Sequence, residues 1–233
     1  MFTVCRSCRP HRTERMSPTL ASVRGMAAPL TDDSSAQARL RIVPAGEAAF
    51  ADVEAVFGTK GDPAHCWCQW YKIPGSDWRS VGDEALHDRL EAQVAAGVDG
   101  PGLLAYDDDI PVGWCAVEPR ANLVRLAHSR IVADGTPDPD FADPGIWAVT
   151  CFVVPRAHRR KGVGRALAEA AVAFAREHGA RILEGYAVDP SERAKTPAAD
   201  LFHGTVTMFE NAGFTEVARP KADRAIMQRR LRD

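Results

Sequence analysis

The stretch from Pro155 to Gly164 holds the residues of this sequence that are best suited to chemistry. Basic residues crowd into it and glycines follow at once: Arg156, His158, Arg159, Arg160, Lys161, Gly162 and Gly164. Glycines let an anion approach the backbone without meeting a Cβ, and the first amides of a helix have no partner within the helix. Guanidinium and ammonium groups add charge-assisted hydrogen bonds. The pattern therefore predicts a site for a phosphate or pyrophosphate group.

The segments on either side of this turn fit that prediction. Residues 146–154 form an apolar run with the length of a buried strand, and Pro155 ends it. Gly179 stands where a glycine that ends a helix is expected. Between the turn and Gly179, apolar residues recur with helical spacing at Val163, Leu167, Ala170, Ala171 and Phe174. A strand, a basic glycine turn and a helix are predicted in this order.

Three phosphate-binding patterns can be compared with this turn. A Walker loop needs GxxxxGK followed by Ser or Thr, which is absent, and a dinucleotide fingerprint needs GxGxxG, whose third glycine is missing. The pattern R/Q-x-x-G-x-G/A is met by residues 159–164. With Val153, Val154 and Pro155 ahead of it, this segment closely resembles the acyl-CoA loop of the GNAT superfamily of N-acetyltransferases. The alternative is an ordinary strand-to-helix turn with a solvated basic face.

The resemblance covers about residues 39–231 and implies the GNAT fold. That fold is α/β (α+β), a mixed and mostly antiparallel central sheet flanked by helices, in the order β-α-α-β-β-β-α-β-α-β-β. The resemblance also implies acetyl-CoA as co-substrate, an amine as acceptor, and a thioester carbonyl polarised by backbone amides near Val153 and Val154. The other coenzyme contacts that it implies are Phe152, Arg159, Arg160, Lys161, Gly162, Val163, Gly164, Arg165 and Phe209.

Secondary structure read from apolar periodicity and from turn residues agrees with this order. Strands are predicted at residues 39–43, 102–106, 110–117, 146–154, 181–188, 214–218 and 225–231. Helices are predicted at residues 47–57, 83–96, 163–178 and 202–212. Residues 58–80 and 119–145 are predicted to be mostly irregular, because Gly, Pro and polar residues interrupt every pattern there.

Composition and charge exclude several classes of function. The net charge is −2, which gives no reason to expect nucleic acid as a partner, and no apolar run approaches the ~20 residues of a membrane helix. We therefore predict no membrane partner and a cytoplasmic location with reduced thiols. Metal ligands are not predicted, because neither Cys5 and Cys8 nor Cys66 and Cys68 supply about four ligands together.

Residues 1–37 differ from the rest of the chain. Residues 1–30 contain five arginines and one acid, a formal charge of +4, and Met16 and Met26 offer later starts. A transit peptide can have this composition, but a disordered extension or a misplaced start is the preferred interpretation. The predicted domains are thus an N-terminal extension, residues 1–37, and an N-acetyltransferase domain, residues 38–233.

Met208 to Phe214, MFENAGF, resembles the second GNAT signature, often written LYxxxGF. In that family the tyrosine commonly protonates the departing CoA thiolate, whereas the matching position here is Phe209. A phenyl ring has no proton to give, so this departure puts tyrosine-type acid catalysis in doubt. Phe209 is expected to pack against the pantetheine arm or the core. A thiol of pKa ~8.5 is a tolerable leaving group even without assistance.

The acceptor amine must lose a proton before it attacks, and the base is not evident. A lysine-like amine of pKa ~10.4 costs about 4.6 kcal/mol to deprotonate at pH 7, and an α-amine near ~8 costs about 1.4 kcal/mol. The strand 146–154 contains no carboxylate, so we predict an acceptor of moderate pKa or a base from elsewhere. The candidate catalytic residues are Glu184, Tyr186 and His203, with Asp189 and the possible nucleophile Cys151 behind them; each could instead be structural.

An aromatic-rich stretch, His65 to Tyr71 with Trp78 after it, is the unusual feature of the sequence. Three of the five tryptophans fall within twelve residues here. In GNAT proteins the loop between the first two helices lies over the acceptor side of the cleft. It could form a pocket wall or could bury its own aromatic residues to anchor itself. The residues predicted to contact the acceptor are Trp67, Trp70 and Trp147.

The function predicted from these features is acetyl-CoA-dependent N-acetylation of an unidentified small molecule or protein by direct attack in a ternary complex. The alternative is an acyl-CoA-binding or sensing module without turnover, since the tyrosine and the strand carboxylate are both missing. A metal- or redox-responsive protein built on the cysteines is a third hypothesis. The segments Cys66–Cys68, 113–120 and 184–186 resemble an actinobacterial subgroup of largely uncharacterised GNAT proteins. The oligomeric state stays open, with a homodimer among the options.

Overall fold

The computed structural model describes residues 40–97 and 100–232. The predicted N-terminal extension, with Cys5 and Cys8, lies outside the described residues. Within them, no helix is both long and apolar enough to cross a membrane.

A seven-stranded sheet forms the centre of the fold, in the order β1-β2-β3-β4-β5-β7-β6. Its strands are β1 (Leu40–Pro44), β2 (Gly102–Asp107), β3 (Ile110–Pro119), β4 (Ile146–Val153), β5 (Ile182–Val188), β6 (Thr215–Lys221) and β7 (Arg224–Arg230). Only β4 and β5 pair in parallel, and every other neighbouring pair is antiparallel. The mixed, mostly antiparallel sheet that the sequence predicts is confirmed.

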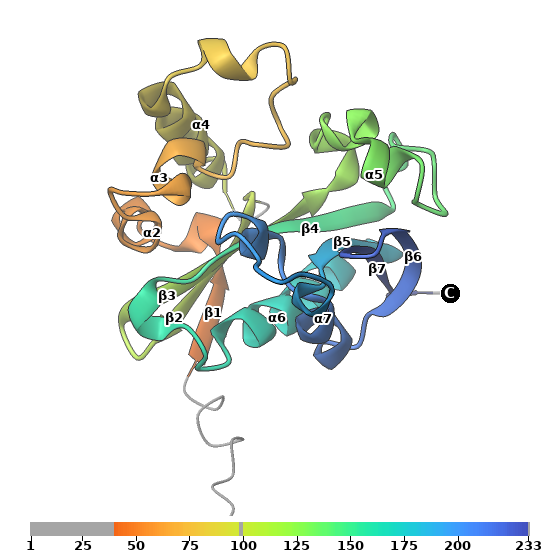
Figure 1. Ribbon diagram of the computed structural model, residues 1–233. Coiled ribbons are helices and arrows are strands. Elements are labelled where there is room, and N and C mark those ends of the chain that lie inside the picture. The colour runs from red at the N-terminus through yellow and green to blue at the C-terminus, as the bar shows by residue number, and fades with distance from the viewer. Residues whose placement is uncertain (1–39, 98–99, 233) are drawn as a thin grey trace, which may run out of the picture. The chain divides into compact units, whose positions relative to one another are not determined.

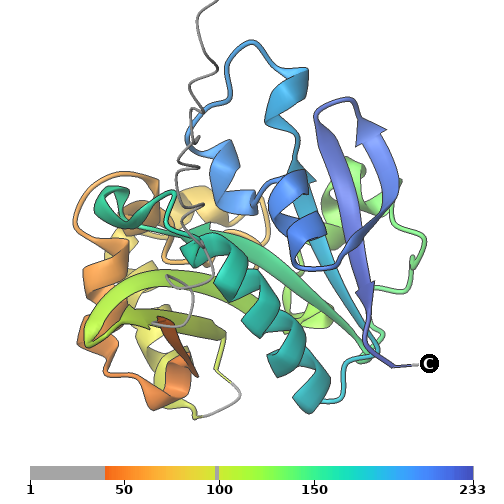
Figure 2. The ribbon, with the colours of Figure 1, turned by 90° about the horizontal axis from the view of Figure 1, so that it is seen from below.

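Helices cover both faces of this sheet (Figure 1). On one face lie α6 (Val163–Glu177) and α7 (Val206–Asn211), and Figure 2 shows α6 crossing the strands. On the other face lie α2 (Phe50–Phe57), α3 (Asp62–Cys66), α4 (Asp83–Ala95) and α5 (Arg130–Ala133). The residues of β4 and β5 are almost all buried, which is why both strands read as continuous apolar runs.

Three clusters of buried side chains make up the core. The largest lies between the sheet and helices α6 and α7. The opposite face carries two smaller clusters. One is built by α2, α4 and the strands β2 and β3, and the other by the segment 123–132 with Ala148, Tyr186 and Ile226. The face opposite α6 is therefore divided.

The strand β4 is irregular where it leaves its neighbours. Its register with β3 shifts between Ala116, which faces Cys151, and Val117, which faces Val149, so that Thr150 is one residue in excess. This β-bulge reverses the alternation of side chains along the strand. In addition, β4 and β5 pair only over Ile146–Val149 and Ile182–Gly185. Beyond that point the edge of β4 facing β5 is not part of the ladder.

Several sequence predictions of local structure need correction. The helix predicted at 202–212 is two elements: a 3₁₀ turn, Asp200–His203, and α7. Gly204 separates them because it adopts a φ of +81°, and the Thr205 side chain then caps α7 by accepting from the amide of Met208. The short helices α3 and α5 lie inside stretches predicted to be mostly irregular. His203 thus precedes the last helix instead of belonging to it.

Candidate active site

The turn between β4 and α6 presents a row of backbone amides. Gly162 is the N-cap of α6 with a φ of +80°, and Arg160 is also left-handed, with a φ of +60°. These conformations turn successive peptide groups the same way, as in anion-binding nests. In the described part of the chain, the amides of residues 160–165 form no hydrogen bond to protein atoms. The hydrogen bonds of α6 begin at the Gly162 carbonyl oxygen, which accepts from the amide of Ala166.

The basic side chains of the turn are available to a bound anion. Arg159 is anchored, because its Nε donates to the carbonyl oxygen of Val154 at 2.9 Å. Arg160 and Lys161 are exposed. Arg165, in the first turn of α6, has its Nε 3.6 Å from a carboxylate oxygen of Glu169. Unpartnered amides and exposed cations fit a diphosphate.

Glycines also allow the helices near the turn to pack closely. A Cβ on Gly164 would lie 3.2 Å from the sulfur of Met208 in α7, and a Cβ on Gly185 would lie 2.5 Å from the ring of Phe209. Phe209 is fully buried, in edge-on contact with Phe152 and Phe214. The ring at the family's tyrosine position therefore belongs to the core, one of the two roles that the sequence left open.

A cavity of about 390 Å³ opens on the face opposite α6, between the two smaller core clusters. Segments distant in sequence meet around it: α3 and the loop that follows, the bulged part of β4, and the 3₁₀ turn Asp200–His203. Its lining residues are Asp62, Pro63, His65, Cys66, Cys68, Trp70, Tyr71, Trp78, Thr150, Cys151, Val153, Ala199, Asp200, Phe202 and His203. Because of the bulge, Thr150 and Cys151 both reach this cavity from adjacent positions.

His203 is the titratable group of the cavity that is best placed for proton transfer. Burial, followed by the positive charge of Arg224, holds the pKa of His203 below its ordinary value of 6.5. A backbone hydrogen bond with Thr150 and the charge of Asp200 oppose this shift without cancelling it. At neutral pH the imidazole is therefore uncharged and can accept a proton. The structure brings this predicted residue to the cavity wall.

Tyr71 is a cavity residue that the sequence analysis did not single out, although it ends the aromatic stretch. Its hydroxyl lies 3.4 Å from Nδ1 of His203. Burial, followed by the nearby Cys151 thiol, raises the pKa of Tyr71, so the phenol stays protonated across the physiological range. The two side chains are 132 residues apart in sequence, which is why only the folded chain reveals the pair.

Glu184 and Tyr186, the other two predicted catalytic residues, lie in a different environment. Tyr186 donates to Glu184 at 2.8 Å, and the Glu184 carboxylate also forms an ion pair with Arg120 at 3.3 Å. Thr136 and Gln228 donate to its second oxygen at 2.9 and 2.8 Å. Glu184 and Arg120 are no more than 1% exposed, and neither Glu184 nor Tyr186 lines the cavity. The structure shows a closed polar network at this place.

The three tryptophans predicted to contact the acceptor are divided between two locations. Trp70 lines the cavity and is 43% exposed. Trp67 is buried, stacks on Phe57 at 5.1 Å between ring centroids, and does not line the cavity. Trp147 points to the other face of the sheet, where it packs edge-on against Phe174. Of these three, only Trp70 reaches the cavity, because side chains alternate along β4 and the loop buries its first tryptophan.

Cysteine thiols contribute to the same cavity wall. Cys68 and Cys151 are both free thiols, and Cys68 accepts from the indole Nε1 of Trp114 at 3.1 Å. Burial raises the pKa of the Cys66 thiol to about 12 and that of Cys68 well above its ordinary value. Trp67 and Cys68 are consecutive left-handed residues, with φ of 43° and 52°. Cys66 and Cys68, on either side of Trp67, both line the cavity. Protonated thiols of this kind are weak nucleophiles.

Two other surface features bring polar side chains together. A hollow of about 480 Å³ lies between α5 and β6, where Arg219 is engaged by Glu216 and Asp189. His87, Asp88 and Glu91 on α4 bring one ligand atom each within 4.8 Å of one another. Both nitrogens of His87 are already bonded, to Glu54 and Asp88. Neither feature connects with the turn or with the cavity.

Comparison with known proteins identifies the class of protein that this site belongs to. The family model of the acetyltransferase (GNAT) family matches residues 67–202, which is more than half of the chain. The chain belongs to this family: it is an acetyltransferase that uses acetyl-CoA as co-substrate. The family resemblance stated from residues 153–164 is thereby confirmed, whereas the second signature, at residues 208–214, lies outside the matched range. No curated protein matches the chain.

Three solved structures resemble this chain at low sequence identity. The yncA structure of Salmonella typhimurium, with its cofactor acetyl-CoA, is 18% identical with a TM-score of 0.48 and covers 84% of this chain and 95% of its own. A ribosomal-protein-alanine N-acetyltransferase from Brucella melitensis is 20% identical with a TM-score of 0.46, covering 82% and 99%. An N-acetyltransferase from Staphylococcus aureus Mu50 is 12% identical with a TM-score of 0.45, covering 83% and 98%.

Proposed function

We propose that this protein, through its predicted domain at residues 38–233, transfers the acetyl group of acetyl-CoA to an amine by direct attack within a ternary complex. One observation carries the proposal. The unpartnered amides of residues 160–165 and the cavity with its histidine–tyrosine pair flank the same strand end, where β4 separates from β5. The arrangement offers one place for a diphosphate and another for proton transfer.

The turn would hold the coenzyme, which supplies an activated acetyl thioester. The amides of Gly162, Val163 and Gly164 would donate to its pyrophosphate, and Arg160 and Lys161 would add charge. Backbone amides near Val153 and Val154 would polarise the thioester carbonyl, since Val153 also lines the cavity. The bound thioester would then face the acceptor across the bulge of β4.

His203 would take the proton that the amine loses. The imidazole is neutral at pH 7, because its pKa lies below 6.5, and it borders the cavity that would receive the amine. A base of low pKa matches an acceptor amine of moderate pKa. Deprotonating an α-amine near ~8 costs about 1.4 kcal/mol at pH 7, against about 4.6 kcal/mol for a lysine-like amine.

Tyr71 would supply the proton that the departing CoA sulfur takes up. Phe209 cannot do so, whereas the phenol of Tyr71 stays protonated beside Cys151 and His203. When the carbon–sulfur bond breaks, the sulfur takes the Tyr71 proton, and the proton held by His203 returns to the Tyr71 oxygen across the 3.4 Å contact. The amine proton thus ends on Tyr71 and the former Tyr71 proton on the CoA thiol, so that the net change is one proton moved from amine to thiol and both side chains return to their starting states.

Release of free CoA thiol from acetyl-CoA in the presence of a panel of amines tests this proposal. We expect release only when an amine is present, and an unchanged protein mass after incubation with acetyl-CoA alone. A stable gain of one acetyl group on Cys151 would contradict direct attack. Coenzyme binding by calorimetry, together with no release for any amine, would favour the non-catalytic alternative.

A pair of matched glycine variants tests whether the turn between β4 and α6 binds the coenzyme. Gly162 and Gly179 stand at opposite ends of α6 with φ of +80° and +87°, so leucine is strained at both by about 1–2 kcal/mol. Gly162→Leu should weaken CoA binding at least tenfold in calorimetry, because its side chain would cover the amides. Gly179→Leu should leave affinity unchanged. Equal affinities in both variants would overturn the assignment of the turn.

A further inference from the structure

The cavity walls also restrict the chemistry of the acceptor. Resting on the function proposed above, we infer that the acceptor is a small amine with an aromatic body and no anionic group. The inference depends on three properties of the cavity, which are its aromatic wall, the rigidity of that wall, and its charge.

Four aromatic side chains line the cavity, and they come from two segments: Trp70, Tyr71, Trp78 and Phe202. Trp70 and Trp78 meet edge to face, with 5.0 Å between their ring centroids. Trp70 remains 43% exposed although it is a large apolar side chain. A second aromatic ring that covers Trp70 would contribute most to the free energy of binding, because aromatic contacts contribute more than the burial of their area alone.

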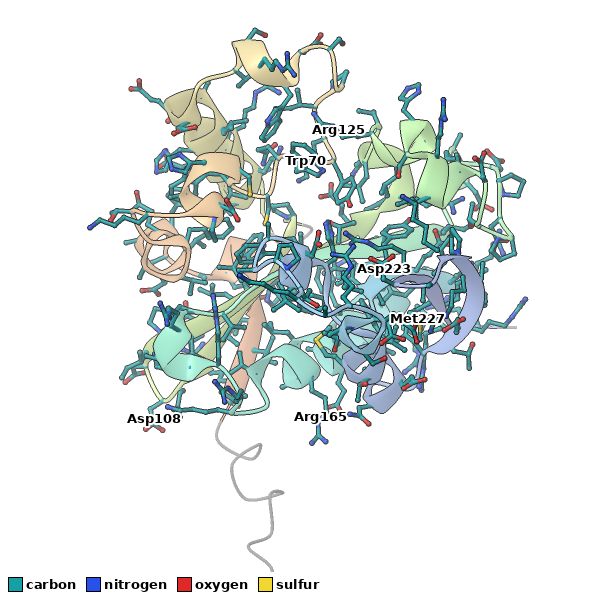
Figure 3. All side chains as sticks on the ribbon, viewed as in Figure 1. Trp70, Asp108, Arg125, Arg165, Asp223 and Met227 are labelled. Atoms are coloured by element: carbon teal, nitrogen blue, oxygen red, sulfur yellow. The ribbon has the colours of Figure 1, made fainter. Side chains whose placement is uncertain are left out.

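The side chain of Arg125 packs against the aromatic wall and fixes its position. The guanidinium of Arg125 lies 4.0 Å from the Trp70 ring centroid and 5.1 Å from that of Trp78. Arg125 is itself fixed, because it donates to the carbonyl oxygens of Ile73 and Pro74. Figure 3 shows Trp70 and Arg125 side by side at this edge of the molecule. A wall fixed in this way loses little conformational freedom when a ligand binds.

The charge of the cavity disfavours an acidic acceptor. Among the described residues that line it, none is a lysine or an arginine. Asp62 is exposed at the cavity and forms no ion pair within the described part of the chain. Asp200 is neutralised by ion pairs with Arg193 and Arg224. A carboxylate on the acceptor would find no lysine or arginine among the described lining residues and would face Asp62, whereas the ammonium form of an amine would be attracted on arrival.

The volume sets the size of this acceptor. About 390 Å³ lies near the lower end of ligand cavities, which span roughly 300–1,000 Å³. A single or fused ring with a short amine arm fits such a space. We therefore assign the cavity to a small aromatic amine.

Three matched amines test the assignment: phenylalaninamide, phenylalanine and alaninamide, each assayed for CoA thiol release at fixed acetyl-CoA. The first and third differ in the ring. The first and second differ in the carboxylate, which also raises the pKa of the amine, so kcat/KM is calculated on the concentration of unprotonated amine. We expect kcat/KM for phenylalaninamide to exceed that for each of the others roughly tenfold, as one aromatic contact or one unpaired charge can supply.

Variants of Trp70 connect the preference to the wall. Trp70→Ala should lower kcat/KM for phenylalaninamide roughly tenfold and leave alaninamide within about twofold, because only the ring contact is lost. Trp70→Phe should restore most of the loss. Ile110→Ala removes another exposed apolar side chain, from the β2–β3 hairpin, and should change neither substrate. Unchanged melting temperatures confirm that the variants are folded.

The outcomes separate this inference from the proposed function. Equal rates for all three amines, or faster turnover of phenylalanine, would overturn the aromatic, uncharged acceptor while acetyl transfer stands. A Trp70→Ala variant that slows phenylalaninamide and alaninamide equally would also overturn it. No release with any amine, while CoA still binds, would overturn both.

Discussion

The hydroxyls of Tyr186 and Tyr71 each face a titratable partner, and the two pairs differ in what surrounds them. Tyr186 donates to Glu184 at 2.8 Å, and Arg120, Thr136 and Gln228 complete the contacts of that carboxylate. Tyr71 lies 3.4 Å from His203, and both side chains line a cavity. The first pair has every polar atom of its carboxylate engaged, whereas the second has room for a further partner. Residue type alone does not distinguish the two.

The comparison shows how a polar group becomes structural or reactive. A buried ion pair contributes to the free energy of unfolding only as long as both partners stay, and breaking it leaves an uncompensated charge. A neutral imidazole beside a cavity contributes little to folding and keeps a lone pair for a proton. Substitutions in the two pairs should therefore affect different measurements.

The largest effect is expected on stability, from Glu184→Ala. Removing this carboxylate strands the fully buried Arg120 guanidinium, which should lower the free energy of unfolding by about 3–5 kcal/mol. Chemical denaturation measures it. The matched control is Glu169→Ala, whose partly exposed partner Arg165 lies 3.6 Å away, and the expected loss there is under about 0.5 kcal/mol. Comparable losses in the two variants would contradict the difference between the two environments.

The next effect is expected on turnover, from His203→Gln. Loss of the base should reduce kcat about 100-fold, at the lower end of what general base catalysis contributes, with a small change in unfolding free energy. The control is His128→Gln, an exposed histidine outside the cavity, which should retain full activity. A kcat that stays within twofold in His203→Gln would remove His203 from the mechanism.

A smaller effect is expected from Tyr71→Phe, which keeps the ring and deletes the hydroxyl. We expect kcat to fall roughly tenfold, since a thiolate of pKa ~8.5 departs tolerably without an acid. The decrease should be greater for acyl donors with a more basic leaving group, and KM for the amine should change little. An equal decrease for every leaving group would assign Tyr71 a purely positional role.

The smallest effect is expected in the pH dependence of kcat/KM and of stability, which should follow the lowered pKa of His203. Because the pKa of folded His203 lies below 6.5, kcat/KM calculated on the concentration of unprotonated amine should stay level as pH falls to 6.5 and decrease only below it. The unfolded chain binds a proton at this histidine more readily, so stability is kept above about pH 6.5 and falls as pH drops from there towards the folded pKa. An acidic limb centred above 6.5 would contradict the neutral histidine.

The fold and the coenzyme turn were largely predictable because their signals are local. The run 146–154, the basic glycines after it and the apolar spacing of α6 lie within about thirty residues, and the structure reproduces each. The family resemblance drawn from the same residues was confirmed as well. Whether these amides bind the coenzyme stays a prediction.

The cavity could not be predicted in the same way, because its parts are distant in sequence. Tyr71 and His203 are 132 residues apart, and Glu184 lies 64 residues from Arg120 and 44 from Gln228. Periodicity identified Glu184 and Tyr186 as neighbours on one face of a strand, but it could not show that the face was closed. The bulge at Thr150 likewise depends on pairing with β3, which no single strand encodes.

The half-buried Cys66 gives the cavity a built-in reporter. Its sulfur lines the cavity, and its pKa of about 12 makes alkylation slow, so modification by a small electrophile can be followed over minutes to hours. Any compound that fills the space should protect this thiol whether or not it is acetylated. Competitive labelling, with the modified residues identified by mass spectrometry, would therefore report the binding of any ligand of the cavity, including inhibitors that are never acetylated.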